Sequence, residues 1–236
     1  MAPTPFDLWF NLHLSGLLGK SPAFDNLVVE GIAHNLLGGY LYGAVLFVCW
    51  IRGSRAGGDK VQGQLLCILL ATMIAIPLML GTSHFISRVP PGSDSRLASR
   101  YPRAVYKNEA ANSFPSYSTA LYTSIALGTY ALDQGAAWLL GLGVVFLVAL
   151  PRIYVGGHYP TDVLAGMVLG TASYFMARAF RESRLNALWN RMSNEKAWSW
   201  ILGQVIVYSW LLNVCDEFRQ AKWFANWIVP IIKTCI

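Results

Sequence analysis

Long runs of apolar residues, separated by short polar stretches, are the main pattern along this chain. A helix needs about 20 consecutive, mostly apolar residues to cross the hydrocarbon core of a bilayer. The runs therefore predict an all-α fold, an integral membrane bundle of six transmembrane helices. We place these helices at about residues 27–51, 63–85, 116–133, 136–151, 161–180 and 197–214.

Two further segments are apolar but not continuous or long enough to span a membrane. Residues 5–24 carry aromatic residues and leucines along one side but are interrupted by polar residues, which is typical of a helix lying in the membrane interface. Lys222–Ile236 falls short of spanning length, and we expect a second interfacial helix there. Because no linker or low-complexity tract divides the chain, residues 1–236 are interpreted as one membrane domain.

The composition agrees with a membrane protein. Of the residues, 55% are hydrophobic and 13% are charged, against about a quarter charged in soluble domains. The net charge is +6, but the lysines and arginines fall in short clusters between apolar runs. There is no basic groove interleaved with aromatic residues, so a nucleic-acid partner is excluded. We expect the partners to be membrane lipids and a phosphorylated substrate, and the sequence does not fix an oligomeric state.

The charged loops predict an orientation in the cell inner (plasma) membrane. Segments 52–60 and 178–196 are net basic and should be cytoplasmic. Alternation then places segments 86–115 and 152–161, together with the N-terminus, on the outer face. Segment 86–115 is itself basic, which conflicts with the charge rule unless its arginines bind an anionic substrate.

One polar stretch on the expected outer face opens the third predicted helix. It runs from Ser113 to Thr119, with Pro115 suited to a first helical turn and Ser113 or Ser116 suited to the N-cap. A helix N-terminus offers backbone N–H groups and a positive dipole end to an anion. The alternative interpretation is that the serines only cap the helix.

The second polar stretch, Pro151–Asp162, joins the fourth and fifth predicted helices. Arg152, His158 and Asp162 stand there in an R-x5-H-x3-D spacing, with two glycines just before the histidine. A guanidinium fork suits a phosphoryl group, and a neutral imidazole can be its nucleophile. Asp162, one helical turn further on, could accept from the other ring nitrogen of His158. The alternative is an interfacial arginine and aspartate that reach water beside an incidental histidine.

This second stretch resembles the third signature motif of the type-2 phosphatidic acid phosphatase superfamily, and Phe114-Pro115-Ser116 is similar to the start of the second motif. The resemblance covers about residues 81–170. It implies a catalytic nucleophile at His158, oriented by Asp162, and a phosphate held by Arg152 and Ser116. No acidic cluster that could hold a divalent cation is expected at the outer face, so we predict neither metal nor cofactor.

Two motifs depart from the family pattern. The second usually reads P-S-G-H or P-S-x-H, whose histidine protonates the leaving group, whereas Tyr117 and Ser118 follow Pro115-Ser116 here. His84, at the outer end of the second predicted helix, is an alternative acid. The first motif, usually K-x6-R-P, allows two alignments. One uses Arg88-Val89-Pro90 with Gly81 at the lysine position, and the other uses Arg96-x6-Arg103 followed by Ala104. The further substrate-binding candidates are therefore Tyr117, Ser118, Arg88, Arg96 and Arg103.

Ser118 at the position of the usual acid affects which leaving groups can depart. Expelling an alkoxide needs a proton, and general acid catalysis contributes about 10²–10⁴ in rate. A phosphate leaving a diphosphate is already a weak base. We therefore expect a membrane lipid phosphatase that acts on a lipid or polyprenyl (di)phosphate through a phospho-histidine at the outer face. A lipid phosphotransferase with an acceptor other than water and a non-catalytic lipid-phosphate binder or transporter stay open as alternatives.

Overall fold

The computed structural model describes residues 1–29, 36–55, 59–101, 112–180 and 209. Within these ranges every regular element is helical, which confirms the all-α prediction for the described part of the chain. Apart from Ser209, the predicted helices at about 197–214 and Lys222–Ile236 lie outside the described residues. So does Arg103.

The bundle contains three helices that are long and apolar enough to cross a membrane, judged on the described residues alone. They are Gly63–Phe85 within α4, the continuous stretch Gln134–Tyr154 and α8, while Gly39–Arg52 within α3 is a shorter apolar helix. Three of the six predicted spans therefore correspond to helices of spanning length, and the count of six is not confirmed. The elements of the bundle are α3 (Leu36–Arg55), α4 (Asp59–Phe85), α5 (Tyr117–Thr129), α6 (Gln134–Gly143), the π-helical η4 (Val144–Ala149), α7 (Leu150–Tyr154) and α8 (Pro160–Phe180).

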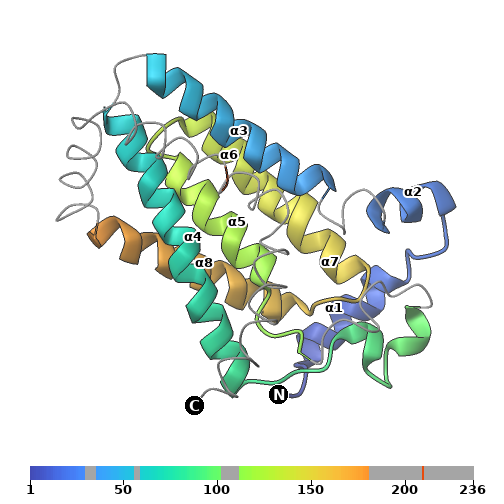
Figure 1. Ribbon diagram of the computed structural model, residues 1–236. Helices are drawn as coiled ribbons and strands as arrows, with labels where there is room; N and C mark the ends of the chain where they lie inside the picture. The colour runs from blue at the N-terminus through green and yellow to red at the C-terminus, as the bar shows by residue number, and fades with distance from the viewer. Residues whose placement is uncertain (30–35, 56–58, 102–111, 181–208, 210–236) are drawn as a thin grey trace, which may run out of the picture.

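Helix α5 is shorter than the predicted span at 116–133 and lies at the centre of the bundle. Its 13 residues extend about 20 Å, less than the roughly 30 Å of a hydrocarbon core. Most of them are buried, because α4, α6 and α8 pack around this helix (Figure 1). The apolar pattern of α5 therefore reflects burial among other helices along its whole length.

Two glycines of α8 allow it to pack closely on α5. A Cβ atom added to Gly166 would lie 2.4 Å from the carbonyl oxygen of Ser116, and one added to Gly170 would lie 2.2 Å from that of Ala120. Small residues four positions apart let two helix backbones approach in this way. This packing places the start of α8 beside the start of α5, so the two polar stretches recognised in the sequence meet.

The N-terminal segment forms two helices, α1 (Pro5–Ser15) and α2 (Pro22–Asn26), in place of one continuous helix over 5–24. Helix α1 packs against α7 and α8 beneath the bundle (Figure 1). Its polar face is turned inward, since Asp7, Asn11 and Ser15 are buried. Its apolar face is turned outward, with Phe6, Trp9 and Leu12 between 42% and 56% exposed. This arrangement suits a helix whose outer side meets lipid.

Candidate active site

The polar stretches and α1 gather at one end of the bundle. Helix α4 begins at the opposite end and finishes here, at Phe85 (Figure 1). The start of α5, the end of α7 and the start of α8 complete the site, and α1 closes it from below. The end of α3 and the start of α4 lie at the other end of the bundle (Figure 1).

His158 lies in the short connection between α7 and α8 and is only partly buried, unlike its neighbours. Its Nδ1 is 2.8 Å from the carbonyl oxygen of Ser113. Because a carbonyl can only accept a hydrogen bond, Nδ1 carries the proton. A neutral His158 therefore has its lone pair on Nε2, the nitrogen that a nucleophilic role requires.

Asp162 holds the backbone beside His158, and its bonds differ from the expected ones. Its Oδ2 accepts from the N–H of Tyr159 at 2.8 Å. Its Oδ1 pairs with the guanidinium of Arg88. The expectation of one helical turn between His158 and Asp162 is wrong, because α8 begins only at Pro160. Nδ1 of His158 accordingly bonds to Ser113.

A tight turn links Arg152 to His158. The carbonyl of Arg152 accepts from Gly157 N–H at 2.9 Å and from His158 N–H at 3.3 Å. Gly156 has φ +75°, and a Cβ atom there would lie 2.8 Å from the ring of Tyr101, so the position requires glycine. Arg152 itself is 6% exposed. Of the two glycines before the histidine, Gly156 is thus the one whose backbone conformation calls for glycine.

Ser116 occupies the N-cap position of α5, as expected, but its side chain caps no N–H group. Its Oγ lies 2.8 Å from Oγ1 of Thr119. Its N–H donates to the carbonyl of Asp162 at 3.0 Å, which ties the starts of α5 and α8 together. In the first turn of α5, Tyr117 is partly buried and Ser118 is 3% exposed.

Arg88, an expected substrate-binding residue, lies between two carboxylates in the interior. Its Nη2 pairs with Asp7 and its Nη1 with Asp162, and all three side chains are fully buried. Its guanidinium also stacks over the ring of Tyr159, with Cζ 4.2 Å from the ring centroid. A buried cation needs such partners to offset its lost hydration. This placement makes Arg88 a support of the third-motif backbone.

The pKa of Asp7 is held below its ordinary value. Burial opposes ionisation, but the backbone N–H groups of Thr4 and Thr161 and the guanidinium of Arg88 together favour the carboxylate. Asp7 is therefore charged at neutral pH. Asp7 was not predicted from the sequence as a site residue.

Asn112 ties the loop of Arg88 to the start of the second motif. Its Oδ1 accepts from the N–H groups of Arg88 at 2.9 Å and Phe114 at 3.0 Å. Its Nδ2 donates to the carbonyls of Ser83 and Ile86. In addition, the N–H of Ser113 donates to the carbonyl of Arg88 at 2.7 Å. The carbonyl that orients His158 is thus fixed through Arg88 and Asn112, neither of which has that role in the sequence prediction.

Arg96 and His84 are both exposed at the surface. Arg96 pairs with Asp94 at 2.7 Å, with 53% of its side chain exposed. The hydrogen bond from Arg96 is the main reason that the pKa of Asp94 falls to about 2. Asp94 also accepts from the hydroxyl of Tyr159 at 2.8 Å, so this pair borders the third motif. His84 is exposed in the last turn of α4, where its ring meets the exposed Phe85 edge-on.

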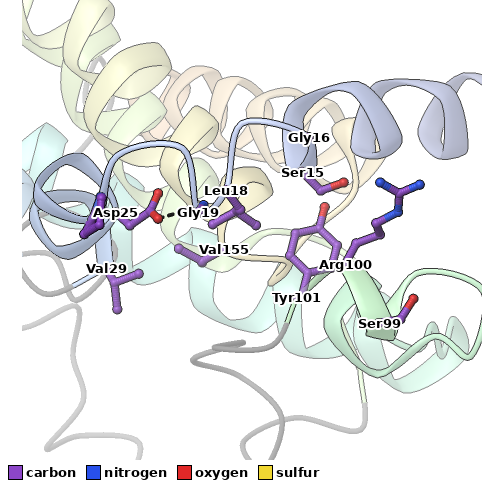
Figure 2. A pocket seen from close by; sticks show the side chains of 11 residues that line it. Ser15, Gly16, Leu18, Gly19, Asp25, Val29, Ser99, Arg100, Tyr101 and Val155 are labelled. Atoms are coloured by element: carbon purple, nitrogen blue, oxygen red, sulfur yellow. Dashed lines mark hydrogen bonds between the residues drawn. The ribbon is translucent and has the colours of Figure 1, made fainter.

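A cavity of about 490 Å³ lies beside the turn that holds His158. Its walls come from the connection between α1 and α2, from η3 (Ala98–Arg100) with Tyr101, and from Val155 (Figure 2). The buried Asp25 forms one side, where its carboxylate accepts from Gly19 N–H and from the hydroxyl of Tyr154. The sequence pattern did not predict this cavity, because its lining comes from segments far apart in the chain.

The chain is similar to curated proteins and to solved structures. Among curated proteins, the bacitracin transport permease protein BcrC of Bacillus licheniformis is 29% identical over 156 residues, covering 66% of this chain and 71% of that protein. The undecaprenyl-diphosphatase of Sulfolobus acidocaldarius is 34% identical over 65 residues, covering 28% of this chain and 32% of that protein. Among solved structures, LpxE of Aquifex aeolicus is 23% identical with a TM-score of 0.48, covering 73% of this chain and 94% of that one. A PAP2-type phosphatidylglycerolphosphate phosphatase of Bacillus subtilis is 20% identical with a TM-score of 0.39, covering 75% and 95%.

The family assignment rests on a separate match. The family model of the PAP2 superfamily, the type-2 phosphatidic acid phosphatases, matches residues 64–185, more than half of the chain. The matched region contains both polar stretches and encloses the segment 81–170 over which the resemblance was seen. The chain belongs to the PAP2 superfamily.

Proposed function

We propose that this protein is a membrane phosphatase that removes a phosphoryl group from a lipid or polyprenyl diphosphate through a phospho-histidine at His158. The observation that carries the proposal is the bond from Nδ1 of His158 to the carbonyl of Ser113, 2.8 Å long. It orients the ring and leaves the Nε2 lone pair for attack on phosphorus. Arg152 begins the turn that ends at His158, and Ser113, whose carbonyl holds the ring, precedes α5 in the chain.

The reaction proceeds in two displacements. Nε2 of His158 attacks the terminal phosphorus, the bond to the bridging oxygen breaks, and its electron pair leaves with the lipid monophosphate. Water then attacks the phospho-histidine, the P–N bond breaks with its electron pair returning to Nε2, and the water proton goes to solvent as inorganic phosphate departs. Arg152, Ser116 and the α5 N-terminus stabilise the phosphoryl oxygens. Asp162 acts as a positioning residue, and neither metal nor cofactor takes part.

The substrate class follows from the missing acid. Ser118, 3% exposed in the first turn of α5, occupies the position of the usual histidine, and a hydroxyl is a poor general acid. Hydrolysis of a diphosphate is slowed little when no group protonates the leaving group, because the phosphate that leaves is a weak base. The name of the Sulfolobus acidocaldarius relative, undecaprenyl-diphosphatase, supports the same class.

Turnover of a polyprenyl diphosphate is expected to exceed that of phosphatidic acid by about 10²-fold or more, the low end of the usual contribution of a general acid. The measurement is release of inorganic phosphate by purified protein from a panel of lipid mono- and diphosphates. His84→Ala is the control variant, and it should leave both rates nearly unchanged because His84 lies exposed beside Phe85. A clear preference for phosphatidic acid would contradict the assignment of Ser118, and a large loss in His84→Ala would make His84 the acid.

A second function, binding or transport of a lipid phosphate without hydrolysis, is favoured by the name of the Bacillus licheniformis relative, a transport permease protein. The same phosphate-release assay separates the two functions, since a binder releases none. A phosphotransferase would instead release phosphate only slowly and would turn over faster when a hydroxyl-bearing lipid acceptor is added.

We further propose a six-span layout, with the site at the outer face of the plasma membrane. Arg52 near the end of α3 and Lys60 near the start of α4 support this orientation, because α4 leads from there to the site at the other end of the bundle (Figure 1). The exposed apolar face of α1 would then rest in the outer interface.

A further inference from the structure

Asp7 of α1 binds the start of α8 as an N-cap residue would. Its Oδ1 accepts from the N–H of Thr161 at 3.0 Å, and its Oδ2 accepts from the hydroxyl of Thr161 at 2.9 Å. Thr161 is the second residue of α8, whose N–H has no acceptor within its own helix. Tyr159, which precedes α8, has no side-chain acceptor suited to capping. The cap of this helix is therefore supplied by α1, far away in the sequence.

Asp7 also completes a buried ion cluster. It shares the guanidinium of Arg88 with Asp162, and none of the three side chains is exposed. Two carboxyl groups thus share one guanidinium in the interior. Such a cluster keeps its geometry only while every member is paired, since removing one partner of a buried pair is strongly destabilising.

Two routes lead from this cluster to His158. Along the first, Asp162 accepts from the N–H of Tyr159, the residue that follows His158. Along the second, the carbonyl of Arg88 accepts from the N–H of Ser113, whose own carbonyl orients the imidazole. Asp7 contacts Arg88, the start of the second route, and is linked through that guanidinium to Asp162, the start of the first.

We propose that Asp7 is a positioning residue for the histidine site, through which α1 holds Thr161 and Arg88 so that His158 keeps its reactive orientation. The inference rests on the proposed function of His158. Asp7 touches no reacting atom and acts only through these two residues. Without its carboxylate, the start of α8 loses its cap and Arg88 loses one of two anchors, so the turn before α8 gains freedom of movement.

The test compares Asp7→Asn with Asp133→Asn. Asp133 is a matched control, because it caps Ala136 N–H at 2.8 Å from an exposed position at the start of α6. We expect kcat for a polyprenyl diphosphate to fall about 10- to 100-fold in Asp7→Asn, as for other residues that orient catalytic side chains. KM should change less than about twofold, since no substrate contact is lost. Hydrogen exchange in peptides covering 156–163 should become faster, and the control should match the wild type in every readout.

Each outcome either supports or overturns the positioning role of Asp7. A folded Asp7→Asn variant with unchanged kcat and unchanged exchange overturns the inference, and so does a rise in KM alone. If Asp7→Asn does not fold, Thr161→Val takes its place, because it removes the hydroxyl that donates to Asp7 and accepts from Arg88. Changes in the same direction are expected from this variant. If wild-type protein releases phosphate from no substrate, the proposed function fails, whereas the exchange measurement still shows whether α1 holds the motif.

Discussion

Replacing His158 with alanine is expected to reduce phosphate release from a polyprenyl diphosphate by about 10³-fold or more, because the imidazole that attacks phosphorus is gone. The fold should persist. His158 is only partly buried, and the substitution removes the hydrogen bond from its Nδ1 to the carbonyl of Ser113. Such a bond contributes about 1 kcal/mol to stability.

The matched control for this variant is His13→Ala. His13 is an exposed histidine of α1 whose Nδ1 also bonds to a backbone carbonyl, that of Trp9, at 2.7 Å. It should retain wild-type rates. The measurements are kcat, KM and the melting temperature in detergent for the three proteins. More than a tenth of wild-type kcat remaining in His158→Ala would point to a different nucleophile.

Replacing Arg152 with alanine is expected to lower kcat/KM by about 10²–10³-fold, the usual cost of one lost donor to a charge that develops in the transition state. Arg152→Lys should recover only part of the loss, since an ammonium cannot contact two phosphoryl oxygens as a planar fork. The turn before His158 should survive both changes, because it is held by the backbone carbonyl of Arg152.

The control for Arg152 is Arg178→Ala, which removes an exposed cation from the far end of α8. It should leave kcat/KM nearly unchanged. Steady-state kinetics over a range of ionic strength distinguish the two sites, because a distant charge affects only the salt dependence of substrate encounter. Equal losses in Arg152→Ala and Arg178→Ala would contradict a specific phosphoryl contact at Arg152.

The third motif could be found from the sequence because it is local. Its residues, from Arg152 to Asp162, lie within eleven positions. The glycine at position 156 is visible in the sequence, and the structure gives the reason for it, a φ of +75°. The helix starts were equally visible, since Pro160 opens α8 and Ser116 precedes α5. What the sequence pattern missed within this motif was the consequence of Pro160: His158 lies before the helix, so helical spacing does not apply to it.

The support around the motif could not be predicted, because it depends on contacts between distant segments. Arg88 looked like a free cation in a basic loop, yet its partners Asp7 and Asp162 lie 81 and 74 positions away. The local sequence places Asp7 in a capping box with Thr4 at the start of α1. That motif explains the bonds between Asp7 and Thr4 but not the contacts of Asp7 with Arg88 and Thr161. The length of α5 was missed for a similar reason, since burial among helices and burial in lipid give the same apolar pattern.

Trapping the phospho-enzyme tests the phospho-histidine mechanism most directly. Purified protein is mixed with a polyprenyl diphosphate labelled with ³²P at its terminal phosphate, and the reaction is quenched in alkali within the first turnover. The label should be found on the peptide that contains His158, be stable in alkali, be released by acid, and be absent from His158→Ala. Phosphate release without any labelled protein in the first turnover, or an alkali-stable label on another residue, would contradict the phospho-histidine mechanism.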